Sequence, residues 1–391
     1  MNTLEQHQPD ILTFDSSINS ISISPFNDEC IISTQNSNIY YVNLNENKKI
    51  KISSSHNNTD INGIYLDNRD NNIYSLGKEE CIRCWTNESF DQQYMIIKKN
   101  QKPDNFIYNN KDNILLTQYE NSYLTAFNIN ELKSLGKIYI PDEDISQFNF
   151  IFDINSILLI TFQRNIYIIS IRSYKPLSMV YCPLDIPTNN KTFPLKPKCS
   201  HISCLNIEAD KAYSAFTFSD GSVGVYLIEK YKGRIFYNLI DNFNLILLHS
   251  GKYNDENSQE LYENLTSFRS EYKSKSIFYE KNSDIILCFH ESLKAIIIRN
   301  FMNKTNINII NLNYFPYSMN INDNGQFLAI GTKEGKIIFI EFEKNELFND
   351  NYELVTYNSH YDKVQCLIFS HDSKELISSS KNEILISNIK I

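Results

Sequence analysis

Glycine, proline and tryptophan are scarce in this chain of 391 residues, which contains 10 Gly, 10 Pro and one Trp. These numbers are low for a sequence with many turns between short apolar segments. Asn, Asp and Ser take most turn positions instead, and Asn and Asp suit them because they tolerate left-handed conformations and hydrogen-bond their own backbone. The hydrophobic fraction of 42% and the aromatic fraction of 13% are ample for a buried β core.

Long apolar runs and strongly basic runs are also lacking. No run of about 18 apolar residues occurs, and the closest segment, Ile235–Leu248, is interrupted by Asn and Asp. The N-terminus MNTLEQHQPD has no basic region followed by an apolar core, so no secretory signal is expected. The protein is therefore expected to be soluble and intracellular, cytoplasmic or nuclear, and its 8 Cys are expected to be free thiols. The net charge of −9 makes direct binding of nucleic acid unexpected.

Catalytic and cofactor-binding motifs are missing. His290-Glu291 lacks the second His of a zinc-protease helix, and no G-x-S-x-G elbow occurs. Residues 331–336, GTKEGK, lack the Ser/Thr and the following helix of a phosphate loop. They are predicted to form a β-turn with Gly335 at positive φ. The sequence predicts no catalytic residue, no cofactor and no small-molecule substrate.

Two cysteine pairs have spacings that occur in metal or redox sites. Cys81 and Cys84 lie in a predicted strand, where residues three apart point to opposite faces, so both sulfurs cannot reach one ion. Cys199 and Cys204 flank His201, but no second cluster completes four ligands. Both pairs are expected to be core or turn residues, and no metal site is predicted.

Eight similar units of three short strands do occur along the chain. Their first strands begin near residues 18, 61, 105, 145, 201, 276, 317 and 364. In the last unit, bulky apolar residues alternate or run together over Val364–Phe369, Glu375–Ser380 and Ile384–Ile389, with polar turns between these segments. Most intervals between first strands are about 40–47 residues, the period of a four-stranded propeller blade. The fold is predicted to be all-β.

The units resemble WD40 repeats, which carry a His ahead of the first strand and a third strand that ends near Trp-Asp. His360 stands at the first of these positions and Trp85 at the second. The resemblance implies one WD40-type β-propeller over residues 1–391, with eight blades counted and seven, the commoner number in the family, as the alternative. The sixth unit, Ser276–Arg299, is the poorest match. In the family the N-terminal strand completes the last blade and closes the ring, and Ile11–Phe14 is assigned this role.

The units depart from the WD40 consensus at a hydrogen-bond network that joins Trp, His, Ser/Thr and a turn Asp in the family. Asp220 is the clear match to the turn Asp, and His201 and His360 are the best matches to the His. No unit holds the full set, so most of the network is expected to be lost. At the Trp position the units carry Val42, Trp85, Phe127, Ile169, Tyr226, Ile298, Ile340 and Ser387. Seven of these eight can fill an apolar slot, so stability is expected to rest on burial.

Two insertions interrupt the repeat, at residues 182–198 and 238–275. The second contains Leu261, Leu265 and Phe268 at the i, i+4, i+7 spacing of an amphipathic helix. This helix either packs against the side of the ring or docks a partner, because long ordered loops on a rigid scaffold often carry function. These three residues are the candidate partner-binding residues.

Three functions are compatible with the sequence. The resemblance favours a non-catalytic scaffold that binds protein partners as a subunit of a multiprotein complex, through propeller faces and inserted loops. The alternative is a propeller subunit that assists an RNA-binding or RNA-modifying enzyme. An enzyme that uses the central channel would require His and carboxylate residues from separate blades to converge, which sequence cannot reveal. Fold alone does not fix function.

Overall fold

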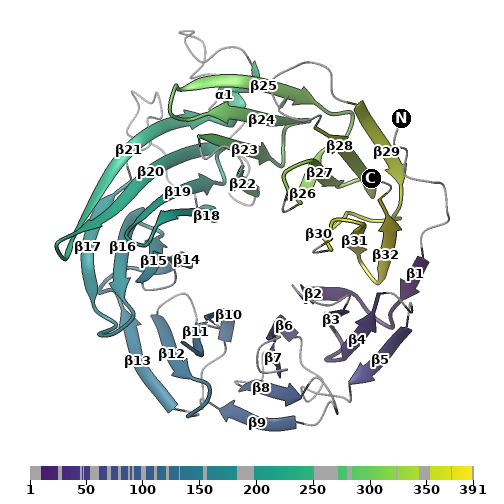
Figure 1. The fold of residues 1–391 in the computed structure, drawn as a ribbon, viewed down its shortest axis with the longest axis horizontal. Coiled ribbons are helices and arrows are strands. Elements are labelled where there is room, and N and C mark those ends of the chain that lie inside the picture. The colour runs from purple at the N-terminus through teal and green to yellow at the C-terminus, as the bar shows by residue number, and fades with distance from the viewer. Residues whose placement is uncertain are drawn as a thin grey trace. The chain divides into compact units, whose positions relative to one another are not determined.

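The strands of this protein form eight antiparallel sheets of four strands each (Figure 1). The computed structural model describes residues 10–24, 29–44, 46, 48–52, 61–67, 72–77, 81–86, 89, 92–97, 103–109, 112–119, 123–131, 133–152, 156–182, 198–250, 272–279, 284–322, 324–342, 353–370 and 372–389. The eight units predicted from the sequence are confirmed, including the sixth. The chain divides into two compact units: residues 1–139, 317–341 and 353–391 form the first, and residues 140–316 and 342–352 form the second.

The first unit contains five sheets, here numbered 1, 2, 3, 7 and 8. Sheet 1 consists of β2 (Ile18–Ile23), β3 (Glu29–Thr34), β4 (Ile39–Asn43) and β5 (Lys48–Ile52). Sheet 2 consists of β6 (Ile61–Asp67), β7 (Asn72–Gly77), β8 (Cys81–Thr86) and β9 (Gln92–Ile97). Sheet 3 consists of β10 (Pro103–Asn109), β11 (Ile114–Tyr119), β12 (Tyr123–Asn128) and β13 (Lys133–Tyr139). Sheet 7 consists of β26 (Pro316–Ile321), β27 (Phe327–Thr332), β28 (Lys336–Glu341) and β29 (Glu353–Asn358).

Sheet 8 joins the two ends of the chain. Its last three strands are β30 (Cys366–Phe369), β31 (Glu375–Ser380) and β32 (Glu383–Asn388), and its fourth is the N-terminal β1 (Asp10–Thr13). β1 pairs antiparallel with β32, from Asp10 opposite Ile386 to Thr13 opposite Glu383. The strand assigned to Ile11–Phe14 is therefore present, one residue earlier, and it covers a strand edge that would otherwise be open to pairing with other chains.

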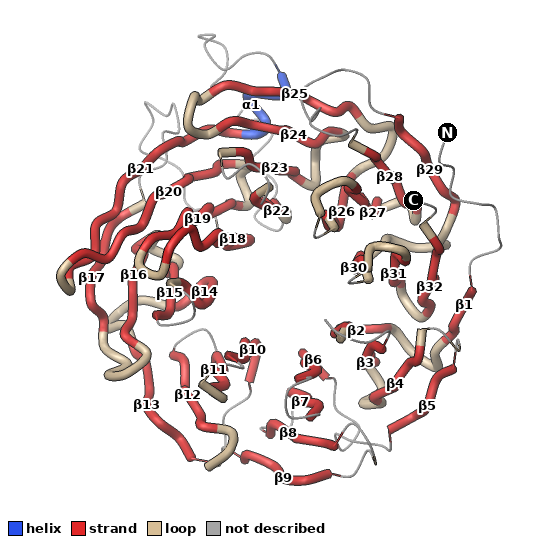
Figure 2. The backbone as a smooth tube through the Cα atoms, viewed as in Figure 1, coloured by secondary structure: helices blue, strands red, loops and turns tan. Residues whose placement is uncertain are grey.

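The second unit contains sheets 4, 5 and 6. Sheet 4 consists of β14 (Ile145–Ile151), β15 (Ser156–Thr161), β16 (Asn165–Ser170) and β17 (Pro176–Tyr181). Sheet 5 consists of β18 (Cys199–Glu208), β19 (Lys211–Phe218), β20 (Ser222–Tyr231) and β21 (Arg234–Asn244). Sheet 6 consists of β22 (Ser274–Phe278), β23 (Ile285–His290), β24 (Ala295–Asn300) and β25 (Thr305–Asn311). The short helix α1 (Leu245–Ser250) follows β21 (Figure 2).

The burial of each strand follows its place in the sheet. Second strands such as β11 (ILLTQY) and β15 (SILLIT) are buried along their whole length, because both of their faces pack on neighbouring residues. Strands covered on both faces read as nearly continuous apolar runs rather than as alternation. Fourth strands such as β13 and β17 are largely exposed. These outer strands carry the surface of the molecule.

The predicted insertion at residues 182–198 lies between the end of β17 and the start of β18, whereas the bounds of the second insertion change in the structure. β21 takes residues 238–244, which the sequence analysis placed in the second insertion, and α1 takes the next six. β22 begins at Ser274, just before the predicted end of that insertion. Residues 183–197 and 251–271 lie outside the described residues, and Leu261, Leu265 and Phe268 lie within the second of these segments.

Candidate interaction surface

The strands of sheet 5 are longer than those of sheet 6, which packs against one of its faces. Its strands contain 10, 8, 10 and 11 residues, whereas those of sheet 6 contain 5, 6, 6 and 7. Three or four additional residues in a strand extend it by about 10 Å. Figure 1 shows the long β20–β21 hairpin, whose turn lies at the left of the view beside β17. On the face toward sheet 6, the far end of sheet 5 is therefore left uncovered.

The uncovered part of sheet 5 forms a surface that we call the ledge: Lys211, Glu229, Tyr231, Arg234 and Phe236. Lys211 is paired with Glu229, Glu229 with Phe236, and Tyr231 with Arg234. Residues that are paired in this way, and residues two apart on one strand, lie on the same face.

The covered part of the same face ends just before the ledge. Tyr213 and Leu227 pack there against Phe278 and Phe301 of sheet 6. The ring centroids of Tyr213 and Phe301 are 5.0 Å apart. The Tyr213 hydroxyl lies 3.6 Å from the sulfur of Met302, which borders the ledge. Sheet 6 thus contributes a border to the ledge but does not cover it.

Large apolar side chains are exposed on and beside the ledge. Tyr231 is 62% exposed, Phe236 is 51% exposed and Met302 is 44% exposed. Each would bury apolar area if a partner covered it, at roughly 25 cal/mol per Å². Tyr231 and Phe236 lie on the same face of sheet 5 among polar residues, and exposed apolar side chains with a polar rim are typical of interaction sites.

The tip of the β20–β21 hairpin is a tight turn with a basic surface. Lys232 and Gly233 have φ of 48° and 77°, as a two-residue hairpin turn requires. The Lys232 Nζ lies 5.1 Å from the centre of the Tyr231 ring. Glu229, the nearest carboxylate on the hairpin, forms an ion pair with Lys211 at 3.0 Å. The tip is therefore positively charged, although the whole chain carries −9.

The ledge is held from behind by sheet 4. On the opposite face of β21, Ile235, Tyr237 and Leu239 pack into the core that sheets 4 and 5 share. The Tyr237 and Ser178 hydroxyls lie 2.6 Å apart and join β21 to β17. A surface backed in this way keeps its shape and loses little entropy when a partner binds.

Sheets 5 and 6 are joined by a buried ion pair. The Arg299 side chain donates from Nε to Asp241 Oδ2 at 2.6 Å and from Nη2 to Asp241 Oδ1 at 3.1 Å. Its Nη1 donates to Asn306 at 2.8 Å, and the guanidinium lies 4.7 Å from the centre of the Phe243 ring. Asp241 is 2% exposed and Arg299 is 6% exposed. This pair fixes the two sheets that form and border the ledge.

His360 joins a carboxylate and a hydroxyl in sheet 8. Its Nδ1 lies 2.8 Å from Glu383 Oε1, and its Nε2 lies 2.8 Å from Ser378 Oγ. The order carboxylate, imidazole, hydroxyl is that of a catalytic triad. Ser378 is completely buried, however, so no substrate carbonyl can reach its hydroxyl. The group instead ties the segment before β30 to β31 and β32, and the role predicted for His360 is confirmed.

In sheets 1 and 4, an acidic residue in the segment before the first strand is the centre of a similar hydrogen-bond network. In sheet 1, Asp15 accepts hydrogen bonds from Asn38 at 2.8 Å and from Tyr40 at 2.9 Å. Burial and the bond to Asp15 raise the pKa of Tyr40 to about 12, which keeps this hydroxyl a donor.

The same arrangement recurs in sheet 4. Glu143 accepts from Asn165 at 2.8 Å and from Tyr167 at 3.0 Å. Neither network was predicted from the sequence, because the WD40 consensus has a His, and no acid, before the first strand. An acid two or three residues before the first strand, together with Asn and Tyr around the start of the third, is the signal that would have found them.

Two other residues, His201 and Asp220, were predicted to belong to the hydrogen-bond network. His201 lies within β18 and not in the segment before it, so its predicted role is wrong. Its Nδ1 is buried without a hydrogen-bond partner. Asp220 does occupy a turn, where its Oδ1 accepts a hydrogen bond from the Ser222 amide at 2.9 Å. Trp85 donates to Ser75 Oγ at 3.0 Å and keeps a single bond of the network in sheet 2.

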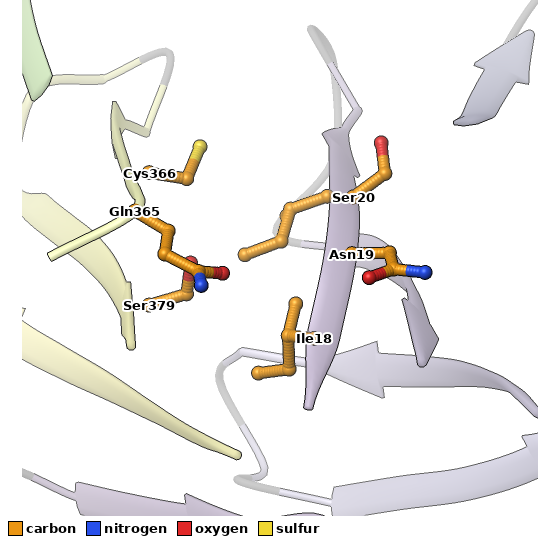
Figure 3. Close-up of a pocket in the computed structure, with 7 residues that line it drawn as sticks. Ile18, Asn19, Ser20, Gln365, Cys366 and Ser379 are labelled. Carbon is orange, nitrogen blue, oxygen red and sulfur yellow. The ribbon is translucent and has the colours of Figure 1, made fainter. Parts of the chain in front are cut away.

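A pocket of about 240 Å³ lies between β2 and the β30–β31 hairpin (Figure 3). It is lined by Ile18, Asn19, Ser20, Ile21, Gln365, Cys366 and Ser379. Ser379 is 1% exposed, and its hydroxyl has no hydrogen-bond partner. These seven residues include neither a His nor a carboxylate, so nothing in the lining activates the Ser379 hydroxyl or the Cys366 thiol as a nucleophile.

All eight cysteines are free thiols, and most are buried. Burial raises the pKa of Cys182 to about 11 and of Cys204 to about 12, which keeps both protonated at neutral pH. A thiol must lose its proton to bind a metal or attack a substrate. Cys81 and Cys84 are three apart on β8, on opposite faces of sheet 2. Within the described part of the chain, no group of three His, Cys, Asp or Glu side chains could hold a metal ion.

Acid is expected to destabilise the protein through His201. Burial, with a smaller contribution from Lys275, lowers the pKa of His201 from 6.5 to about 4. Between these values the unfolded chain binds a proton at this residue and the folded protein does not. The contribution of His201 to stability is therefore complete above pH 6.5 and is lost as the pH falls toward 4. We expect a loss of up to about 3 kcal/mol in the free energy of unfolding.

Urea unfolding at a series of pH values measures this loss. A His201→Gln variant removes the titrating ring, so its stability should depend less steeply on pH between about 6.5 and 4. Burial also lowers the pKa of His360, which adds a slope of the same sign in both proteins. Equal slopes for the variant and the wild type would contradict the assignment to His201.

Comparisons with known proteins identify the fold. No protein-family model matches the sequence, and no curated protein matches it. Among solved structures, Sqt1 of Saccharomyces cerevisiae is similar with a TM-score of 0.72 at 8% identity, covering 97% of this chain and 98% of its own. The C-terminal WD40 domain of Sif2 is similar with a TM-score of 0.69 at 10% identity, covering 97% of both chains. The chain has the WD40-type β-propeller fold. A third similar chain, from the Mitotic Checkpoint Complex, has a TM-score of 0.56 at 8% identity and covers 100% of this chain and 94% of its own.

Each of the eight sheets is one blade of this WD40-type propeller. The WD40 hydrogen-bond network is largely replaced: Asp15 and Glu143 each hold an Asn and a Tyr in two blades, whereas His360 joins a Glu and a Ser in a third. No helix among the described residues is long and apolar enough to cross a membrane. The ledge and the tip of the β20–β21 hairpin are features of a single blade, because among the described residues no other sheet has strands of this length.

Proposed function

We propose that this propeller is a non-catalytic scaffold, a subunit of a multiprotein complex, which binds a protein partner on the ledge of sheet 5. The observation that carries the proposal is the uncovered end of this sheet, where Tyr231 and Phe236 are exposed on a rigid support. Binding of this kind requires surface rather than reactive groups. The buried hydroxyl of Ser378 and the protonated thiols of Cys182 and Cys204 agree with a protein that binds rather than catalyses.

The fold supports membership of a protein complex, and the thiols support a location in the cytoplasm or nucleus. One similar chain of known structure comes from the Mitotic Checkpoint Complex, an example of this fold within an assembly. Free thiols throughout the chain suit the reducing cytoplasm or nucleus, where we place the protein. Leu261, Leu265 and Phe268 of the second insertion remain the proposed second contact with a partner.

Purification of the tagged protein from its own cells tests the scaffold function. We expect one or more proteins to co-elute in stoichiometric amount from the wild type and to be lost from a Tyr231→Ser/Phe236→Ser variant. Loss of central apolar contacts typically costs about 2 kcal/mol, or roughly thirtyfold in Kd. Met179→Ser is the matched control, because Met179 is 56% exposed on β17 in the same unit, outside the ledge.

Three other results would count against the proposal. Absence of any stoichiometric protein would exclude a constitutive subunit. Recovery of RNA alone, removed by nuclease, would favour the alternative in which the propeller assists an RNA-acting enzyme. Partners retained by the ledge variant and lost from Met179→Ser would exclude the ledge as the binding surface. Thermal unfolding of both variants must match the wild type, which we expect because all three side chains are exposed.

A further inference from the structure

We propose that the segment recognised by the ledge is an acidic, extended peptide with one large apolar residue. This inference rests on the proposed function and specifies the chemistry of the partner. The apolar residue packs against Phe236, and the carboxylates lie against Arg234 and Lys232 at the hairpin tip.

The charge of the hairpin tip favours an acidic partner. Lys230, Lys232 and Arg234 lie within five residues that contain no acid. The adjacent Glu229 is already paired with Lys211 at 3.0 Å. On a chain with a net charge of −9, this tip is a local positive site on an acidic molecule. Long-range repulsion from the rest of the surface and attraction at the tip would steer an acidic ligand to the ledge.

The spacing of the ledge residues predicts a pattern in the ligand. Arg234 and Phe236 are two apart on β21 and lie on the same face, about 7 Å from each other along the strand. An extended peptide has the same repeat, so its carboxylate should stand two residues from its apolar anchor. Lys230 is paired with Ile235 on the opposite face, so it adds charge without a direct contact.

Acidic residues at this end of sheet 5 determine along which strand an acidic ligand can bind. Glu208 and Asp210 are exposed in the turn between β18 and β19, on the inner side of the sheet. The basic residues are on the outer β20–β21 hairpin. An acidic peptide would be repelled from the inner turn, so it should run along β21, the edge strand of the sheet.

The apolar part of the ledge favours a peptide over RNA. Phe236 and Met302 offer no hydrogen bonds to bases, and Met suits varied apolar side chains because it is flexible and polarisable. Three cations would neutralise few phosphates, whereas nucleic-acid binding sites typically neutralise about 6–10. The excess negative charge of the chain adds repulsion against a polyanion.

Selection from a random displayed peptide library on the purified protein tests the inference. We expect the enriched peptides to carry Asp or Glu two residues from Phe, Tyr, Leu or Met. A synthetic peptide with the selected consensus should bind the wild type and Met179→Ser equally. It should bind a Lys232→Glu/Arg234→Glu variant about tenfold more weakly, since each exposed ion pair contributes up to about 1 kcal/mol. A peptide with Lys in place of each acid should show the reverse preference.

Several outcomes would overturn the inference. These are no enriched peptide, enrichment of neutral or basic peptides, equal affinity for the wild type and the Lys232→Glu/Arg234→Glu variant, or tighter binding of oligouridylate than of the selected peptide. The Lys232→Glu/Arg234→Glu variant distinguishes failure of this inference from failure of the scaffold function. Cellular partners that are lost from Tyr231→Ser/Phe236→Ser but retained by Lys232→Glu/Arg234→Glu would leave the scaffold intact and remove the acidic ligand.

Discussion

Replacement of Arg299 by methionine is expected to lower the free energy of unfolding by about 3–5 kcal/mol, because it leaves the Asp241 carboxylate buried without its cation. Asp241 is 2% exposed and receives two hydrogen bonds from Arg299, at 2.6 and 3.1 Å. After the substitution it would retain the amide of Asn242 at 2.9 Å.

Urea unfolding of two further variants separates this effect from loss of packing. Arg299→Met/Asp241→Leu removes both charges and should recover most of the lost stability, because an apolar pair of similar volume often replaces a buried ion pair at little cost. Lys211→Met breaks the solvent-exposed pair with Glu229 and should change stability little. Equal losses for the single and the double variant would show that the pair itself does not stabilise the junction of sheets 5 and 6.

Replacement of Gly335 by alanine is the second large effect that we expect. Gly335 has a φ of 77°, as predicted for the turn between β27 and β28. A left-handed conformation costs a residue with a Cβ about 1–2 kcal/mol. A Cβ at this position would also lie 2.8 Å from the carbonyl carbon of His360 and collide with its oxygen. Since backbone atoms must then move, an overpacking cost of about 1–3 kcal/mol is added.

Gly233→Ala is the matched control for this substitution. Gly233 also has a φ of 77°, but a Cβ there would meet nothing within 4 Å. The Gly233→Ala variant should therefore lose only the stability that the left-handed conformation costs. Gly335→Ala should be the less stable of the two variants in thermal and urea unfolding. Equal losses would mean that the contact with the backbone of His360 relaxes without cost. The Gly335→Ala variant should also weaken the His360 group, because the His360 amide donates to the Gly335 carbonyl at 2.9 Å.

Much of the fold could be read from local sequence. The strand predicted at Glu375–Ser380 agrees with β31, and the one at Ile384–Ile389 is displaced by a single residue. These segments are short, apolar and bounded by polar turns, so local pattern alone identifies them. The first strand of the same unit begins at Cys366 rather than at Val364, because boundaries depend on pairing with a neighbour.

Less of the candidate site could be read in this way. Tyr231 and Phe236 are ordinary strand residues in sequence, and their exposure depends on where sheet 6 ends. Asp241 and Arg299 are 58 residues apart, and nothing in either segment marks them as partners. Leu261, Leu265 and Phe268, which the sequence did single out, lie outside the described residues and remain predictions.

By itself, the sequence determined the all-β class and the repeated three-strand units, because these follow from the period of apolar residues and from turn chemistry along a short stretch of chain. The sequence left seven units as the alternative to eight, and the closing role of Ile11–Phe14 came from the resemblance to WD40 repeats. The structure has eight sheets and pairs β1 with β32. Tertiary structure alone decided which strands overhang, which acids replace the expected histidines and which charges are buried together. These features depend on contacts between sheets, and contacts between residues distant in sequence leave no periodic signal in either segment. The surface proposed for binding belongs to this second group, since it exists only where one sheet extends beyond the next.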